Sequence, residues 1–134
     1  MISTHVKEKT KTLIQDLRKE LRVYFPSMEF NISFEHDDKE GVTNIVIQYT
    51  DGISEQRVKN IGRLFNHSYY SSRELVKVHV SVKRSMSHEV ENRLITETKS
   101  VFKIRDNIKD NNEILFNGMS LKQYIVGLFK TRDF

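Results

Sequence analysis

Cysteine and tryptophan are absent from this chain of 134 residues, proline occurs once and glycine five times. Without cysteine the chain has no disulfide framework, no thiolate metal site and no cysteine nucleophile. It also has no apolar run long enough to span a membrane, and its first residues lack the apolar core of a signal peptide. These absences lead us to expect a cytoplasmic location and no membrane partner.

A large excess of one charge is lacking as well. The chain has 22 Lys and Arg against 18 Asp and Glu, a formal net charge of +4. This balance permits a polyanionic partner but does not require one. With 37% hydrophobic and 30% charged residues, the composition is that of a folded domain rather than a disordered tail. The length predicts a single domain over residues 1–134.

The hydrophobic pattern predicts an α+β fold. Helices are expected where apolar residues recur with a 3.6-residue period, and strands where apolar and polar residues alternate. The expected helices are 4–25, ended by Pro26, then 54–66, a third that Ser87 can cap, and a last one that begins at the Ser120–Gln123 capping box. The expected strands are 28–35, 42–49 and 76–82. We expect a three-stranded, mainly antiparallel sheet packed by helices on one face, with an extra C-terminal helix.

Three connections carry signals of their own. Asp51-Gly52 predicts a tight turn with positive φ at Gly52, and Ser54 is placed to cap the helix that follows. Residues 66–72 are interpreted as a polar loop with two tyrosines. Residues 105–113 predict a charged loop, and Asn117-Gly118 predicts another turn.

Catalytic chemistry is not indicated. The sequence has no recognisable Ser-His-Asp arrangement, Gly-rich phosphate loop or zinc-binding helix motif. His36-Asp37-Asp38 offers metal-ligand types, but Asp is expected in such a turn for backbone reasons alone. We therefore expect a protein that is not an enzyme, with no catalytic residue, metal site or cofactor. A metal-dependent nuclease is the less favoured alternative and would need acids clustered near His36 or His79.

The candidate binding residues are basic or aromatic. They are Lys7, Lys11, Arg18 and Arg22 on the first helix, Lys77, His79, Lys83 and Arg84 on or after the third strand, and Tyr69 and Tyr70 in the polar loop. The basic rows suit phosphates and the tyrosines suit stacked bases. The alternatives are a solvated helix face and tyrosines that pack on the edge of the core. The outer strand face lacks the aromatics of RNA-recognition sheets. Of the two rows, we expect the strand row to dominate binding.

Several of these segments together resemble a known family. They are Tyr24-Phe25-Pro26 at the end of the first helix, Tyr49-Thr50-Asp51-Gly52, the helix with Val58, Ile61 and Phe65, and the tail from Tyr124 to Asp133. The pattern is similar to the large polyvalent protein-associated domains of phages and conjugative plasmids, in particular the twenty-ninth class. Ile53 stands where the family often has proline, and residues 84–113 match less well.

The resemblance implies an origin in a phage or other mobile element and a location in the bacterial host cell. It implies a non-catalytic accessory protein acting on host defence, as an anti-CRISPR or anti-restriction type inhibitor. Its partner would be a host defence nuclease, the nucleic acid of that nuclease, or their complex, and DNA or RNA could also be bound directly. The alternative is a general DNA- or RNA-binding accessory protein of phage or plasmid. The family has no established catalytic residues to carry over.

Overall fold

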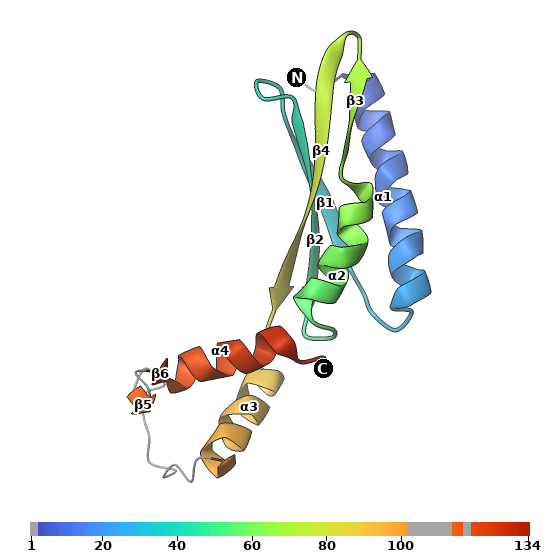
Figure 1. Cartoon of the computed structure of the whole chain (residues 1–134). Helices are drawn as coiled ribbons and strands as arrows, with labels where there is room; N and C mark the ends of the chain where they lie inside the picture. Colours follow the sequence, from blue (N-terminus) through green and yellow to red (C-terminus); the bar gives the residue numbers. More distant parts are fainter. Residues whose placement is uncertain (1–2, 102–113, 117–118) are drawn as a thin grey trace. The chain divides into compact units, whose positions relative to one another are not determined.

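A computed structural model describes residues 3–101, 114–116 and 119–134 (Figure 1). The chain divides into two compact units. Unit 1 comprises the residues up to Tyr49 and Glu55–Arg84, and unit 2 comprises Thr50–Ser54 and Ser85–Phe134. The predicted loop at 105–113 and the predicted turn at Asn117-Gly118 lie outside the described residues. Among the described helices, none combines the length and the apolar character that crossing a membrane requires.

Unit 1 is built on a four-stranded sheet. In chain order its elements are α1 (Thr4–Tyr24), β1 (Asn31–Asp37), β2 (Val42–Thr50), α2 (Glu55–Gly62), the 3-10 helix η1 (Arg63–Phe65), β3 (His67–Ser71) and β4 (Glu74–Ser85). The strand order is β1-β2-β4-β3. The β1–β2 and β3–β4 pairs are antiparallel hairpins. Strands β2 and β4 run parallel. The N–H of Lys77 donates to Gly41 O near the start of β2, and the N–H of Asp51, just after the end of β2, donates to Ser85 O at the end of β4, so residue numbers rise in the same direction along both strands.

The prediction of three strands is therefore wrong by one. Residues 67–71, interpreted as loop, form β3 and pair with β4 from His67↔Val78 to Ser71↔Glu74. The two residues of the connecting turn, Ser72 and Arg73, have φ values of 50° and 70°. Two-residue hairpin turns need positive φ, and Gly or Asn usually supplies it. Because neither residue is Gly or Asn, the sequence carries no signal for this hairpin.

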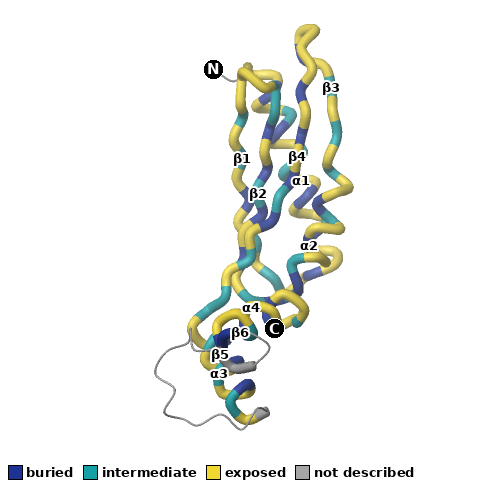
Figure 2. Tube along the Cα trace, turned by 60° about the vertical axis from the view of Figure 1, so that its left-hand side comes forward, coloured by how far each residue is buried: buried dark blue, intermediate teal, exposed yellow. Residues whose placement is uncertain are grey.

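One face of the sheet carries the core of unit 1. Its buried residues alternate along the strands: Ile32, Ile45, Ile47, Tyr49, Val76, Val78, Val80 and Val82. Helices α1 and α2 cover this face, as predicted, and contribute Val6, Leu17, Leu21 and Val58 (Figure 1). Gly62 of α2 lies so close to Val80 that an added Cβ would be 3.0 Å from its Cγ1 atom. Figure 2 shows the alternation of buried and exposed residues along β2 and β4, which leaves the opposite face exposed.

Unit 2 has its own small core. Its elements are α3 (His88–Val101), β5 (Ile114–Phe116), β6 (Met119–Ser120) and α4 (Leu121–Thr131). The buried cluster consists of Val90, Leu94, Leu121, Ile125 and Phe129. The predicted caps of α3 and α4 are confirmed: Ser87 Oγ accepts from the N–H of Val90, and Ser120 and Gln123 form a reciprocal capping box. The predicted C-terminal helix is α4.

The predicted turn at Asp51-Gly52 is confirmed, and it belongs to unit 2. Gly52 has φ 62°, and Asp51 also takes positive φ, 54°. The N–H of Ser54 donates to the carboxylate of Asp133 over 2.7 Å, and Gly52 O accepts from the N–H of Phe134. Helix α2 begins at Glu55, immediately after Ser54, where the cap prediction placed its start.

Candidate functional site

The strand row consists of Lys77, His79 and Lys83 of β4. These residues alternate with the buried valines of the core, so their side chains lie on the face opposite α1 and α2. All three are exposed. Successive same-face residues in a strand are about 6.6 Å apart, and the hydrogen-bonded backbone fixes that spacing. The backbone therefore holds the Cα atoms of these three residues at fixed positions along one face.

Neutral side chains surround the strand row. On the same face, β2 contributes Asn44, Val46 and Gln48, and β3 contributes Ser68 and Tyr70. The acids of this face, Glu35 and Asp37, belong to β1, which is separated from β4 by β2. Among the described residues, no carboxylate lies within 4 Å of Lys77 or Lys83, so neither lysine forms an ion pair with a described acid. Arg84 is partly buried and has an interaction of its own, so it does not extend the exposed row.

The two candidate tyrosines lie on opposite faces of the sheet. Tyr70 is 72% exposed and lies opposite Leu75, on the same face as the strand row. This corrects the interpretation that the outer strand face has no aromatic residue. The correction follows from the strand that the sequence did not reveal, because only strand geometry places Tyr70 beside β4. Sequence reasoning found the residue but missed its position.

Tyr69 faces the helices instead. Its ring stacks on His67 with centroids 5.8 Å apart and meets His5 edge-on at 6.2 Å. Lys9 Nζ lies 4.2 Å from the ring centroid. Among the described residues the buried hydroxyl of Tyr69 has no hydrogen-bond partner, and burial raises the pKa of Tyr69. Tyr69 is thus enclosed by other side chains and does not offer a face for base stacking.

The helix row lies on the other side of unit 1. Lys7, Lys11, Arg18 and Arg22 are exposed along α1, which covers the core face of the sheet. Lys11 is 3.7 Å from Glu8 in an exposed ion pair. The two basic rows therefore do not form one surface, and a partner that lies flat on the sheet contacts the strand row alone.

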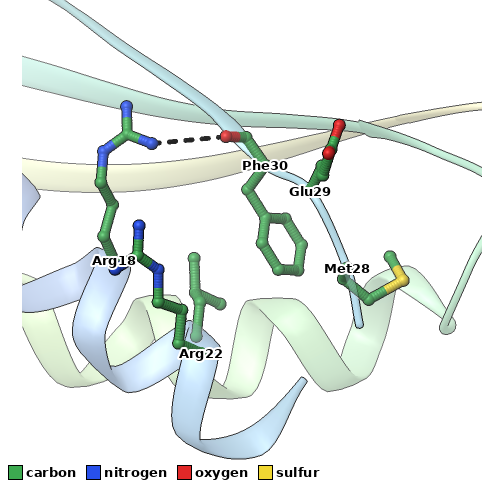
Figure 3. A pocket seen from close by; sticks show the side chains of 6 residues that line it. Arg18, Arg22, Met28, Glu29 and Phe30 are labelled. Carbon is green, nitrogen blue, oxygen red and sulfur yellow. Dashed lines mark hydrogen bonds between the residues drawn. The ribbon is translucent and has the colours of Figure 1, made fainter. Parts of the chain in front are cut away.

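The structure adds a pocket that sequence reasoning missed. Arg18 and Arg22 lie beside Met28, Glu29 and Phe30 around a volume of about 330 Å³ (Figure 3). The predicted strand began at Met28, which placed these residues in the sheet. In the structure β1 begins at Asn31, so residues 28–30 run beside α1 instead. Arg18 Nη1 donates to Phe30 O over a long 3.5 Å.

The residues considered for metal binding make contacts within the β1–β2 hairpin. Asp37 Oδ1 accepts from the N–H groups of Lys39 and Glu40 at 2.9 and 3.2 Å, which is the role the turn interpretation gives it. His36 Nδ1 is 2.8 Å from Thr43 Oγ1, and its Nε2 is 3.3 Å from Asp38. In the part of the chain that the structure describes, no three His, Asp or Glu residues are grouped so as to hold a metal ion. His79, the other residue named for a nuclease, lies in the strand row, and none of the acids that the structure describes pairs with it.

Comparison with known families identifies the class of protein. The chain is a domain of the kind associated with large polyvalent proteins of phages and other mobile elements. In particular, residues 8–127 match the model of large polyvalent protein associated domain 29, and the chain belongs to this family. This confirms the resemblance in the sequence. Neither a curated protein nor a solved structure is significantly similar to the chain.

Proposed function

We propose that the protein is a non-catalytic accessory factor that acts on host defence, as an anti-CRISPR or anti-restriction type inhibitor. It binds a defence nuclease loaded with nucleic acid, and it contacts the nucleic acid through the open face of the unit 1 sheet. The observation that carries the proposal is the strand row: Lys77, His79 and Lys83 stand exposed on one face, and no acid in the described part of the chain forms an ion pair with them. Family membership supports the setting in a mobile element.

In the proposed contact, basic side chains bind phosphates and an aromatic side chain binds a base. Lys77 and Lys83 neutralise phosphates, and His79 lies between them as a hydrogen-bonding group. Tyr70, 72% exposed on the same face, offers a ring on which an unpaired base stacks. Helices α1 and α2 pack on the opposite face of the sheet, so the backbone of the binding face loses little conformational entropy on binding. Stacking and phosphate contacts tolerate any sequence, which suits a general blocking role.

A general DNA- or RNA-binding accessory protein is the second candidate, and the same face favours it. The two candidates differ in their target. An inhibitor of a loaded nuclease has protein contacts as well, so its binding survives at high salt. A protein that binds nucleic acid alone loses affinity steeply as salt rises.

The test is an inhibition assay with a nucleic-acid-loaded defence nuclease. The inhibitor proposal predicts a complex of fixed stoichiometry, loss of cleavage, and retention of the complex in 0.5 M salt. EDTA treatment of the purified protein leaves binding unchanged, because no step uses a metal. Binding to free nucleic acid without any effect on nucleases supports the second candidate. Turnover of nucleic acid by the protein itself contradicts both.

A further inference from the structure

The pocket beside the C-terminal half of α1 has the composition of an anion site with an aromatic wall. Its volume is about 330 Å³, at the lower end of small-ligand sites. It is lined by Arg18, Leu21, Arg22, Met28, Glu29 and Phe30 (Figure 3). All six belong to unit 1.

The two arginines bring two positive charges to the pocket. Arg18 and Arg22 are one helical turn apart on α1, a spacing at which like charges repel and destabilise a helix. Among the described residues, no carboxylate lies within 4 Å of either guanidinium. The contact of Arg18 with Phe30 O, at 3.5 Å, uses one of its five N–H donors. Glu29, the acid of the rim, pairs with neither arginine and partly opposes an anion.

The apolar side of the pocket is held in place. Phe30 is partly exposed, and its ring packs against Tyr49 at 5.4 Å and Phe25 at 6.3 Å between centroids. Leu21 is buried, and Met28 is partly exposed. A fixed ring beside two guanidinium groups fits a ligand that joins a planar apolar group to a phosphate. Guanidinium groups bind phosphate through paired hydrogen bonds.

We propose that this pocket binds the terminal nucleotide of a nucleic-acid strand, with its phosphomonoester between Arg18 and Arg22 and its base against Phe30. The inference rests on the proposed function and adds a second contact to it: the nucleic acid binds the open sheet face, and its end passes around the sheet edge to the pocket beside α1. A terminal phosphomonoester carries a charge of about −1.5 to −2 at pH 7, so the two arginines attract it more strongly than a singly charged group, even with Glu29 at the rim. An internal phosphodiester or a peptide carboxylate carries a single charge. The pocket therefore selects strand ends.

The test is an NMR titration of the full chain with thymidine 5′-monophosphate, with thymidine and inorganic phosphate as control ligands. The proposal predicts saturable shifts at Phe30 and Met28, with affinity for the nucleotide at least about tenfold above that for either control ligand. Arg22→Gln weakens nucleotide binding by about tenfold, and Glu29→Gln tightens it because it removes a repelling charge. Unchanged affinity in Arg22→Gln, or weaker binding in Glu29→Gln, overturns the proposal. So does tighter binding of N-acetylphenylalanine, which would assign the pocket to a peptide end.

A second comparison separates this inference from the proposed function. Oligonucleotides with a 5′-phosphate and with a 5′-hydroxyl are titrated into wild type, Arg22→Gln and Lys77→Glu/Lys83→Glu. If both oligonucleotides bind wild type equally and only the lysine variant fails, the end-binding inference is wrong and the proposed function stands. If the 5′-phosphate strengthens binding and this gain vanishes in Arg22→Gln alone, the inference is supported. Full binding by the lysine variant contradicts the proposed function whatever the pocket does.

Discussion

The carboxylate of Asp51 accepts a hydrogen bond from the backbone N–H of Ser87, 36 residues farther along the chain, over 2.8 Å. The N–H of Asp51 donates to Ser85 O over 2.7 Å. The turn after β2 is thereby fixed to the start of α3, inside unit 2. The sequence marked both places separately, Asp51 as a turn residue and Ser87 as a cap, and the structure joins them.

The hydrogen bond between Asp51 and Ser87 gives the first prediction. Asp51→Ala removes the acceptor for the N–H of Ser87, and we expect the free energy of unfolding to fall by about 1 to 2 kcal/mol. Asp51→Asn keeps an acceptor oxygen, so we expect its free energy of unfolding to fall less than that of Asp51→Ala. Chemical denaturation of the three proteins measures the difference. Equal free energies of unfolding for wild type and Asp51→Ala would show that the hydrogen bond between Asp51 and Ser87 does not contribute to stability.

Gly52 gives the second prediction, because its φ is 62°. A β-branched side chain is strained at such an angle, so Gly52→Val should lower the free energy of unfolding by about 1 kcal/mol or more. Gly127→Ala is the matched control in the same unit, since an added Cβ there meets nothing within 4 Å. In the interior of helix α4 that change should stabilise the protein by about 0.5 to 1 kcal/mol. If Gly52→Val and Gly127→Ala shift the thermal midpoint in the same direction, Gly52 has no special backbone role.

Tyr69 gives a prediction about pH. Its buried hydroxyl lacks a partner among the described residues, so Tyr69→Phe should leave the free energy of unfolding unchanged or raise it by up to about 1 kcal/mol. Burial raises the pKa of Tyr69, so the folded chain holds the phenol proton more tightly than the unfolded chain. The contribution to stability is therefore fully present below the unfolded pKa, about 10, and is lost as pH rises through the folded value.

Denaturation curves at pH 8 and at several values above pH 10 check this. The stability of wild type should fall more steeply with rising pH than that of Tyr69→Phe. Tyr70→Phe, which changes an exposed tyrosine, serves as the control and should follow wild type. A loss of more than about 1 kcal/mol in Tyr69→Phe at pH 8 would mean that the hydroxyl makes a stabilising hydrogen bond.

Locally encoded features were predictable from the sequence. Helix α1 ends before Pro26, and Ser87 and Ser120 cap helices with partners three residues away. What the sequence could not supply was pairing between distant segments. Strand β3 exists because its backbone pairs with β4, and its turn uses Ser72 and Arg73 without a turn signature.

The same limit applies to the candidate site. The strand row followed from the alternation along β4, but the place of Tyr70 on its face depends on the missed strand. The pocket depends on where β1 begins, which is Asn31 rather than Met28. Because the strand begins three residues later than predicted, Phe30 lies beside α1 and not in the sheet. The alternation of apolar and polar residues continues across this boundary, so it does not show where the strand begins.

The most direct test of the central claim compares two double charge reversals, Lys77→Glu/Lys83→Glu on the sheet and Lys7→Glu/Lys11→Glu on α1. Both change the net charge equally at exposed lysines, and neither touches the pocket of Arg18 and Arg22. The measurement is the Kd of a single-stranded oligonucleotide, free or held in a nuclease complex, over a series of salt concentrations. We predict that the sheet variant binds much more weakly than wild type and that its salt slope falls by about 0.7 for each lost phosphate contact. The helix variant should weaken binding only modestly, because its lysines act across the thickness of unit 1 through a field screened over about 10 Å. Small and equal effects of the two variants would contradict the claim that the open sheet face binds nucleic acid.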